Sequence, residues 1–248
     1  MSFKKLNNSI AGLFRLFRHL KIFNPQTEFQ NKRVVIIGAA DSIYNQENGN
    51  YIDQFDIVIR VNKAVHNLNP SNYSFVGSRT THLFHSFYEN EFSGGGLIDW
   101  ELFDKVGVKK VINPNRTYKG IITHLNYYKR KQESRKTYII SSKNYNRISN
   151  ELNNAIPTIG FSTLMLLLDT KCAELFITGF TFFKTPYVKG YRDELLDMDI
   201  NREHINKQGI HDIELEFEIF KKSLTTAKPK KVTFDADLKK IIENSFIL

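Results

Sequence analysis

The sequence predicts an α/β fold built on a mostly parallel sheet flanked by helices. Continuous runs of β-branched residues, such as "RVVIIG" at 33–38 and "AELFITGF" at 173–180, are typical of strands buried on both faces. A segment with helical spacing of its apolar residues lies at 160–172. Strands that alternate with helices favour a parallel sheet, because parallel neighbours need a crossover connection. With 248 residues and a hydrophobic content of 41%, the chain can bury a sizeable core.

The first element expected along the chain is a basic amphipathic helix within residues 7–23. Its apolar residues recur at helical spacing, and its basic residues fall on the other side. The apolar residues are Ile10, Leu13, Phe14, Phe17 and Leu20, and the basic ones are Arg15, Arg18 and His19. Such a helix either lies on a membrane surface or packs on the rest of the protein. The sequence "NPQ" at 24–26 breaks the chain after it, so residues 1–30 are assigned to this helical segment.

Predicted strands and helices then alternate. Buried strands are expected at 33–38, 56–61, 107–115, 135–141 and 173–180. The helix at 160–172 would place Leu164, Leu167 and Leu168 on one face. The stretch 116–136, rich in Tyr, Lys and Arg, is either an exposed helix or an insertion.

The strand predicted at 56–61 is unusual because polar side chains stand at its end. Arg60, Asn62 and Lys63 offer hydrogen-bond donors where a buried strand needs none. In an open parallel sheet, ligands sit outside the carboxyl ends of the strands. We therefore expect a ligand near Asn62 and near the residues that follow the other strands. These are Gly38, Ala39, Ala40, Asp41 and Ser42 after one strand and Thr178, Gly179 and Phe180 after another.

The net charge of +9 is concentrated at the two ends of the chain. Residues 1–33 and 221–248 hold the excess of Lys and Arg, and the residues between them are nearly balanced. A balanced body argues against a nucleic-acid groove, so no nucleic-acid partner is expected. Basic ends suit either contact with an anionic membrane or ordinary solvated tails.

Targeting and redox signals favour a cytoplasmic protein. No run approaches the roughly 20 apolar residues of a membrane span. Arginines interrupt the apolar stretch near the N-terminus, which therefore lacks the order of a signal peptide. Cys172 is the single cysteine, so no internal disulfide is possible.

Two turns rich in small residues are candidates for phosphate contacts. "GAADS" at 38–42 lacks the G-x-G-x-x-G spacing and the P-loop pattern, so no nicotinamide or flavin cofactor is expected. Its small residues would still admit a phosphate or ribose, although a simple strand–helix turn explains them equally well. "NAIPTIGFS" at 154–162 places Thr158 and Gly160 before an apolar helix, as either an anion site or an ordinary N-cap does.

Acidic and histidine motifs suggest two further chemistries. The triplets "DMD" at 197–199 and "DAD" at 235–237 have the D-x-D form that holds a divalent metal in many sugar transferases. There is no cluster of His and Cys in the sequence that suits zinc. In "GIHDIELEFEIF" at 209–220, His211 stands just before a predicted helix, as either a general base or part of a cap.

The strand ends and motifs described above follow one another along the chain in an order that resembles the animal-type sialyltransferase family, whose members transfer sialic acid from a CMP-sugar. The long sialyl motif of that family runs from a strand ending in Gly-Asn, through I-D-x-x-D-x-V-x-R-x-N-K-A, to V-G-x-x-T-T-H. This chain has "VVIIGAADS" at 34–42, "IDQFDIVIRVNKA" at 52–64 and "VGSRTTHLF" at 76–84. The second and third segments match closely, and a chance match of both in this order is improbable.

The shorter motifs of the family also have counterparts. "PTIGFSTLMLLLDTKCAELFITGF" at 157–180 resembles the short motif, which joins P-S-T-G, a helix with a Cys and a strand ending in Gly-Phe. His211 and Glu216 in "HDIELE" match the very short motif H-x-x-x-x-E. A further family motif carries a histidine between these two motifs, and His204 in "REHINK" is its candidate. The resemblance covers residues 33–84 and 155–217.

The chain departs from the family pattern at three positions. Ala39 replaces the asparagine expected after Gly38, and Ile159 replaces a threonine of P-S-T-G. Val34 stands where animal members carry a cysteine, so Cys172 has no partner, and the transmembrane stem is missing. These departures suit a bacterial-type member that uses its amphipathic N-terminal helix as a peripheral anchor.

The resemblance implies a Rossmann-like fold of the metal-independent glycosyltransferase type, in one domain over residues 31–248, with no cofactor. Both D-x-D triplets would then be surface acids. In the implied inverting displacement, His211 takes the proton of the acceptor hydroxyl and His204 donates to the departing phosphate. The implied CMP-sugar contacts are Gly38, Ala39, Asp41, Ser42, Asn62, Thr158, Ile159, Gly160 and Phe180.

Three polar residues in the motifs are expected to be structural. Glu216 lies five residues after His211 and, at 3.6 residues per turn, points away from its face. We expect Glu216 to fix the local backbone. Arg60 and Asp56 are expected to be structural and to form a pair.

Two alternatives to a sialyltransferase stay open. The loss of the asparagine at Ala39 favours a close variant that uses another CMP-activated acid, such as Kdo, in capsule or lipopolysaccharide synthesis. A non-catalytic nucleotide- or glycan-binding protein on the same fold is favoured by Ala39 and Ile159, whereas His211 and "IRVNKA" argue against it. In the catalytic cases the acceptor is a glycan or glycolipid.

Overall fold

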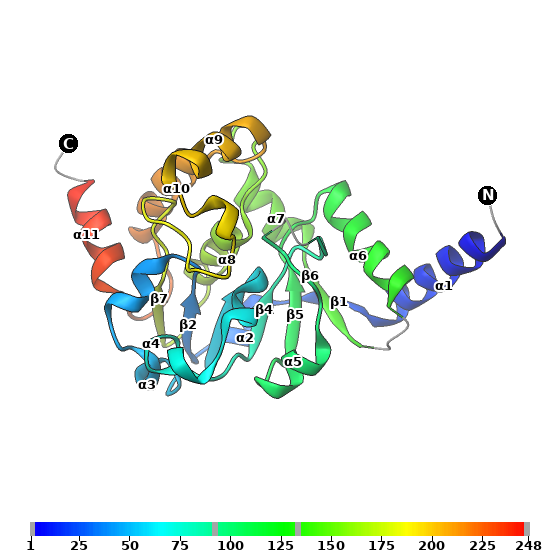
Figure 1. The fold of residues 1–248 in the computed structure, drawn as a ribbon, viewed down its shortest axis with the longest axis horizontal. Coiled ribbons are helices and arrows are strands. Elements are labelled where there is room, and N and C mark those ends of the chain that lie inside the picture. Colours follow the sequence, from blue (N-terminus) through cyan, green and yellow to red (C-terminus); the bar gives the residue numbers. More distant parts are fainter. Residues whose placement is uncertain (1–2, 91–93, 132–134, 246–248) are drawn as a thin grey trace.

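In the computed structural model, an eight-stranded sheet runs through the protein with helices on both faces (Figure 1). The structure describes residues 3–90, 94–131 and 135–245. The strand order is β1-β6-β5-β4-β3-β2-β7-β8, and each neighbouring pair is parallel. The expected α/β class with a mostly parallel sheet is confirmed.

The elements have the following bounds. The strands are β1 (Leu20–Phe23), β2 (Arg33–Ile37), β3 (Ile57–Val61), β4 (His82–Phe84), β5 (Lys110–Asn113), β6 (Thr137–Ile140), β7 (Glu174–Thr178) and β8 (Val232–Phe234). The α-helices are α1 (Phe3–His19), α2 (Pro25–Phe29), α3 (Gly49–Ile52), α4 (Tyr73–Val76), α5 (Trp100–Lys105), α6 (Tyr118–Arg130), α7 (Ser142–Ser149), α8 (Ile159–Leu168), α9 (Met198–Gln208), α10 (Ile213–Leu224) and α11 (Ala236–Asn244). The 3₁₀ helices are η1 (Asp41–Asn45), η2 (Asn62–Asn67), η3 (Pro70–Asn72) and η4 (Asp193–Leu195).

Alternation along the central strands builds a core on each face of the sheet. In β2, Val34 and Ile36 pack into one core while Val35 and Ile37 pack into another, because successive strand residues point to opposite faces. All four side chains are buried, as expected for a strand covered on both sides. One face holds α8 and α10, and the opposite face holds α3 and α4 beside β2 and α5 and α6 beside β4 and β5.

The direction of chain travel reverses at β2. From β2 the chain adds β3, β4, β5 and β6 on one side, and it then returns to place β7 and β8 on the other. The carboxyl ends of β2 and β7 therefore flank a topological switch point, where ligands bind in open α/β sheets.

Helix α8 differs from the expected one-sided amphipathic helix. All residues from Phe161 to Leu168 are buried, because the helix lies between the sheet and helices α7 and α10. It ends at Leu168 with Asp169 as its C-cap, four residues earlier than expected.

The N-terminal helix forms as expected, but it is not alone in its segment. Helix α1 ends at His19, and β1 and α2 follow within residues 1–30, with β1 paired to β6. Helix α1 packs along α6, where a Cβ on Gly12 would lie 2.6 Å from Cγ of Lys129. Figure 1 shows α1 beside α6 at one end of the longest axis and α11 at the other. The division of the chain at residue 30 stays a prediction.

The structure adds three short strands, β1, β4 and β8, that the residue pattern does not reveal. Within the stretch 116–136, Tyr118–Arg130 form helix α6, whose Tyr127 and Tyr128 are fully buried, and residues 132–134 lie outside the described residues. Within the described residues, no helix combines the length and the apolar character needed to cross a membrane.

Two buried histidines stand behind the loop that follows β4. The His85 ring contacts the carbonyl of Gly95 at 2.6 Å and accepts from the Phe87 amide at 2.8 Å. The His124 ring stacks on Phe87 with centroids 3.8 Å apart, and its Nε2 contacts Thr137. Burial lowers the pKa of His85 to about 4 and the pKa of His124 to about 3.

These two histidines predict an acid-sensitive fold. Both pKa values lie below the ordinary value of 6.5, so stability from the neutral rings is complete above pH 6.5 and is lost as the pH falls toward the folded values. Glu216, whose pKa burial raises to about 8, gains stability over the same interval, so we expect a net fall in the free energy of unfolding of about 1–3 kcal/mol between pH 6.5 and 4.5, measured by urea denaturation. Glu28 and Glu174, with pKa values of about 2, add losses only below pH 4.5.

The His124→Phe variant separates the histidine contribution from other groups. It keeps an aromatic ring beside Phe87 and removes one titrating group, so the acid loss should shrink, whereas His66→Ala at an exposed histidine should leave it unchanged. Equal acid losses in the wild type and the His124→Phe variant would contradict this account.

Candidate functional site

The turns after β2 and β7 meet at the switch point in backbone contact. Gly38 N donates to Thr178 O at 2.9 Å, and Ala40 N donates to Gly179 O at 3.0 Å. A Cβ on Gly38 would stand 2.1 Å from Gly179 O and 2.9 Å from the Phe180 ring. Position 38 therefore requires glycine, because any side chain would push the two turns apart.

Most of the turn after β2 is enclosed. Gly38, Ala39 and Ser42 are buried, and only Asp41 among the expected contact residues of this turn is partly exposed. The Ser42 hydroxyl has no hydrogen-bond partner among the described residues. Contact of these four residues with a CMP-sugar stays a prediction. Because the other three are buried, Asp41 is the residue best placed to make such a contact.

The C-terminal segment supports the same turn. Asp235 accepts from Gly179 N at 2.7 Å and caps α11 through Leu238 N at 2.8 Å. Burial raises the pKa of its carboxyl. The expectation of surface acids is therefore wrong for Asp235, which is a buried capping residue, whereas Asp197 of the other triplet accepts from the first amides of α9. The described residues contain no cluster of three or more His, Cys, Asp or Glu suited to a metal.

Asn62 follows β3 directly and takes a left-handed conformation, with φ of 50°. Asparagine adopts this region more readily than most residues, which gives one reason for its place at the strand end. Its Oδ1 accepts from Ser86 N at 3.1 Å, and its side chain also hydrogen-bonds the buried phenol of Tyr191. The Asn62 amide therefore joins the end of β3 to the loop after β4 and to the loop after β7. The residue is partly exposed at the carboxyl edge of the sheet.

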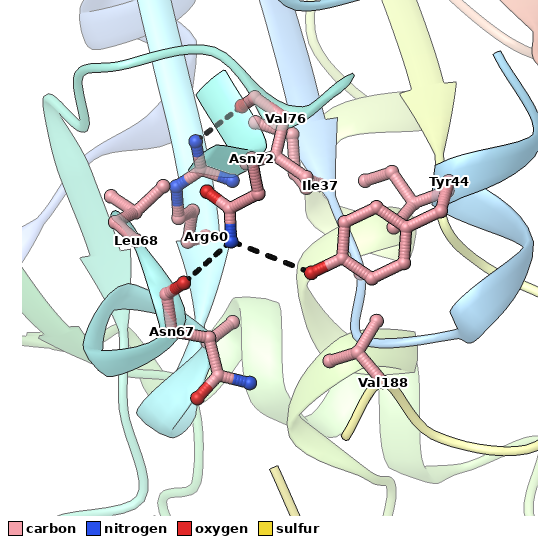
Figure 2. A pocket seen from close by; sticks show the side chains of 11 residues that line it. Ile37, Tyr44, Arg60, Asn67, Leu68, Asn72, Val76 and Val188 are labelled. Atoms are coloured by element: carbon pink, nitrogen blue, oxygen red, sulfur yellow. Dashed lines mark hydrogen bonds between the residues drawn. The ribbon is translucent and has the colours of Figure 1, made fainter. Parts of the chain in front are cut away.

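Arg60, in β3, lines the cavity shown in Figure 2. It is 1% exposed, and its guanidinium donates to Val76 O, to Gly77 O and to Thr80 Oγ1. Burial lowers its pKa to about 10. The structural role expected for Arg60 is confirmed, since its donors hold the chain between β3 and β4.

The cavity beside Arg60 is too small to hold a CMP-sugar. Its volume of about 20 Å³ has room for one water molecule. Asn72 closes it by donating to Asn67 O at 2.7 Å and to the Tyr44 hydroxyl at 3.4 Å (Figure 2). The expected Arg60–Asp56 pair is wrong: Asp56 accepts from Arg33 N at 2.8 Å, because it precedes β3 while Arg60 lies near its other end.

Glu216 joins α10 to the start of α8. Its carboxyl accepts from Thr158 N at 2.6 Å and hydrogen-bonds Thr158 Oγ1 at 2.7 Å, while Thr158 Oγ1 accepts from Phe161 N at 3.1 Å. Thr158 is the N-cap of α8, so Glu216 fixes the backbone there, as expected. Burial raises the pKa of Glu216 to about 8.

His211 lies in the segment that leads into α10. Its Nδ1 contacts Ile156 O at 2.5 Å, and Ile156 N donates to Ile210 O at 2.8 Å. A proton on Nδ1 makes this hydrogen bond and leaves Nε2 as the lone-pair nitrogen. Burial lowers the pKa of His211, which favours this neutral form. The segments around Ile156 and His211 are therefore joined by backbone and side-chain bonds at three points, with Glu216 as the third.

The first turn of α8 borders Phe180. A Cβ on Gly160 would lie 3.0 Å from the Phe180 ring, so the small residue admits the ring at the helix start. Among the described residues, no hydrogen-bond acceptor is found for the amides of Ile159 and Gly160. These amides lie in the first turn of α8, at the positive end of the helix dipole. This part of the site has the chemistry of an anion contact.

His204 lies apart from this unit, on α9. Its Nε2 contacts the Gln208 side chain at 2.8 Å and the Arg192 guanidinium at 3.4 Å. Among the described residues, no bond joins His204 to Thr158 or His211. The structure therefore brings together Thr158, Gly160, Phe180 and His211, and it leaves His204 apart from them on α9.

Sequence reasoning missed the loop after β7. Tyr191 lies fully inside, hydrogen-bonded to Asn62, and Lys63 stands 5.8 Å from its ring centroid. Arg192, beside it, pairs with Glu194 at 3.0 Å. The only signal was position: "YVKGYRDE" at 187–194 follows a strand whose carboxyl end was already a candidate edge.

Comparisons with known proteins agree with this architecture. The family described as "Glycosyltransferase family 29 (sialyltransferase)" matches residues 1–228. A mammalian sialyltransferase crystal structure is similar with a TM-score of 0.56 and 15% identity, over 93% of this chain and 85% of that chain. A mammalian sialyltransferase in complex with Gal-beta-1-3GalNAc-ortho-nitrophenol is similar with a TM-score of 0.54 and 18% identity, over 91% of this chain and 79% of that chain. The sialyltransferase CstII from Campylobacter jejuni has a TM-score of 0.48 and 12% identity, over 84% of this chain and 86% of that chain. No curated protein sequence matches.

The bond between Glu216 and Thr158 predicts a pH-dependent difference between two variants. The Glu216→Gln variant imitates the protonated carboxyl and should fold with near wild-type stability, whereas Glu216→Leu leaves Thr158 N without its acceptor and should lose about 1–3 kcal/mol. The folded pKa of about 8 lies above the ordinary 4.5, so this stabilisation is complete below pH 4.5 and is lost as the pH rises through 8. Urea denaturation across that interval should show Glu216→Gln gaining on the wild type with rising pH. A constant difference would contradict the raised pKa.

Proposed function

The chain belongs to glycosyltransferase family 29, the sialyltransferases, and from this we propose that it moves an acidic sugar from a CMP-sugar donor to a glycan hydroxyl. The position of His211 carries the proposal. Its Nδ1 is held by Ile156 O, its Nε2 is left to accept a proton, and Glu216 ties the same segment to the start of α8. A proton acceptor and a helix start suited to an anion thus form one unit at the carboxyl edge of the sheet.

For the donor, we propose that CMP lies across the switch point. The amides of Ile159 and Gly160 would meet the phosphate, Phe180 would pack near the base, and Asn62 would bond the phosphate or ribose. Lys63, next to Asn62, carries a charge that suits a phosphate or a sugar carboxylate, whereas Arg192 nearby is already paired with Glu194.

The reaction we propose is a single inverting displacement. The acceptor oxygen forms a bond to the anomeric carbon while the bond from that carbon to the phosphate oxygen breaks. CMP leaves with the electron pair, and the acceptor proton passes to Nε2 of His211. His204, on α9 and next to Arg192, would give a proton to the departing phosphate.

The identity of the acidic sugar separates the close alternatives. Ala39, in place of the asparagine of the family motif, removes an amide from the turn after β2, which favours a donor other than CMP-sialic acid, such as CMP-Kdo. The product would then enter capsule or lipopolysaccharide synthesis. One of the similar structures holds the glycan Gal-beta-1-3GalNAc-ortho-nitrophenol, and we infer a glycan or glycolipid acceptor here as well.

Release of CMP from CMP-sialic acid and from CMP-Kdo tests the proposal directly. We expect turnover of one donor in the presence of EDTA and a loss of about 10²–10⁴ in rate for His211→Ala, the usual value of a general base. The lowered pKa of His211 keeps the ring neutral, so the acid limb of the pH–rate profile should lie below pH 6.5.

The control is His66→Ala, at an exposed histidine whose ring contacts Leu97 O, which should keep the wild-type rate. If neither donor turns over, calorimetric titration with CMP decides between the remaining cases. Absence of CMP binding would refute a CMP-sugar donor, and tight binding without turnover, with acceptors supplied, would favour a non-catalytic binding protein.

We also propose that α1 holds the protein on the inner face of an anionic membrane. Its outward side chains include Phe14, 72% exposed, and Phe17, 76% exposed, with Ile10 and Leu13 beside them. Arg18 is exposed on the same helix, and Arg15 donates to Tyr128 O, which anchors the helix to α6. An apolar strip bordered by basic residues is typical of an interfacial helix.

Replacing Phe14 and Phe17 with Glu tests this contact. We expect the double variant to lose at least about tenfold in binding to vesicles that contain anionic lipid, measured by co-sedimentation, because two exposed aromatic rings leave the interface. Tyr118→Glu, at an exposed aromatic residue of α6, is the control and should bind as the wild type does. Unchanged binding of the double variant, or no binding of the wild type, would refute the membrane contact.

A further inference from the structure

Basic residues gather at the amino edge of the sheet, at the opposite ends of the strands from the candidate site. Because neighbouring strands are parallel, they all begin at this edge, and residues far apart in the sequence meet there. Three neighbouring strands, β2, β7 and β8, begin at or just after basic residues. The amino-edge cluster, as we name it, consists of Lys32, Arg33, Lys171, Lys228, Lys230 and Lys231.

Backbone hydrogen bonds hold the segments of the cluster side by side. Ala173 N donates to Lys32 O at 2.8 Å, which joins the segment before β7 to the one before β2. Lys230 N donates to Cys172 O at 3.0 Å, which joins the segment before β8 to the other side of the same chain. Lys171 directly precedes Cys172. Three lysines therefore extend from three adjacent chains, which are about 4.8 Å apart in a sheet.

Two carboxylates within the cluster each face two cations. Glu174 pairs with Arg33 at 2.8 Å and with Lys231 at 2.7 Å. Asp169 pairs with Lys228 and, at 3.2 Å, with the arginine of α7. Each carboxylate carries one negative charge, so each of these groups keeps a positive charge in excess.

Lys32, Lys171 and Lys230 add unpaired charges to this excess. All three are exposed, and within residues 3–90, 94–131 and 135–245 none of their ammonium groups has an ion-pair or hydrogen-bond partner. Asp56 also lies at this edge, where it accepts from Arg33 N. With Asp56 included, the positive charges are still more than twice as many as the negative ones.

The cluster suits a broad anionic surface. Its unpaired charges are all lysines, which act as flexible point charges and lack the planar fork with which arginine holds one phosphate. None of the large hydrophobic side chains that are exposed in the described residues belongs to the cluster segments, so no ring is offered there to a nucleic-acid base or a sugar. A layer of lipid headgroups needs only several cations on one face of the protein.

We propose that the amino-edge cluster binds the headgroups of anionic lipid, as a second membrane contact that is independent of the proposed glycosyl transfer. Helix α1 lies at one end of the longest axis and β7 lies toward the other, so two contacts would hold that axis along the membrane (Figure 1). Stable peripheral anchoring takes two such signals, here an amphipathic helix and a basic surface. The candidate site, at the carboxyl ends of β2 and β7, would then face the aqueous side.

Removal of the three unpaired charges tests this contact. The variant carries Lys32→Gln, Lys171→Gln and Lys230→Gln, and the probe is vesicles of equal parts phosphatidylglycerol and phosphatidylcholine. We expect the wild type to co-sediment with them and the variant to bind at least about tenfold more weakly, because each lysine near an anionic surface contributes about fivefold. Urea denaturation should be unchanged, since the three ammonium groups have no partner to lose in the described structure.

A matched control changes the net charge equally at the other edge of the sheet. Lys119, Lys143 and Lys189 are exposed and follow the carboxyl ends of β5, β6 and β7, so replacing all three with Gln should leave vesicle binding as in the wild type. Arginine at the three cluster positions keeps the charge and should also bind as the wild type does.

Equal losses in the two glutamine variants, or no loss in either, would overturn the proposal, as would a wild type that does not bind the vesicles. A wild type that binds an oligonucleotide more tightly than vesicles, with that binding lost in the cluster variant, would overturn it in favour of a nucleic-acid partner. These outcomes do not depend on the release of CMP. They are also separate from the effect of replacing Phe14 and Phe17, which tests the contact of α1 alone.

Discussion

The contact between the turns after β2 and β7 sets the geometry of the candidate site. Two backbones approach so closely that position 38 has no room for a Cβ, and Gly179 adopts a left-handed φ of 69° to complete the fit. The approach places Phe180 on Gly160, and through it the start of α8. A steric limit at one glycine thus determines where the end of a helix, and the groups tied to it, can lie.

Many polar residues of the motif segments join one segment of the protein to another through hydrogen bonds. Arg60 uses its donors on backbone carbonyls, and Glu216 uses its carboxyl on the cap of α8. Buried donors and acceptors are costly unless they are paired, so each such residue specifies one loop arrangement. The side chains placed to meet a ligand, such as His211, depend on these neighbours for orientation.

The sequence was sufficient for the fold class and for the backbone-fixing role of Glu216, and it offered the N-cap at Thr158 as one of two interpretations, because buried parallel strands and helix caps have local signatures. It was insufficient for β4 and β8, since three-residue strands carry too little pattern to separate them from loops. It also misplaced the partner of Asp56, because ion pairing depends on which ends of strands meet. Tyr191 escaped notice because its contact with Asn62 joins residues far apart in the chain.

Helix α6 packs along α1, where Gly12 lies against Lys129, and it borders the loop after β4 through Thr123, whose hydroxyl donates to Ser86 O at 3.1 Å. A helix with side chains is about 10–12 Å across, so a lipid surface under α1 would lie within a few helix widths of that loop. An acceptor carried on a lipid would then be found by diffusion within a plane. Its local concentration would depend on how many lipids carry it and little on the volume of the cell, and glycans too short to leave the surface would be favoured over long soluble ones.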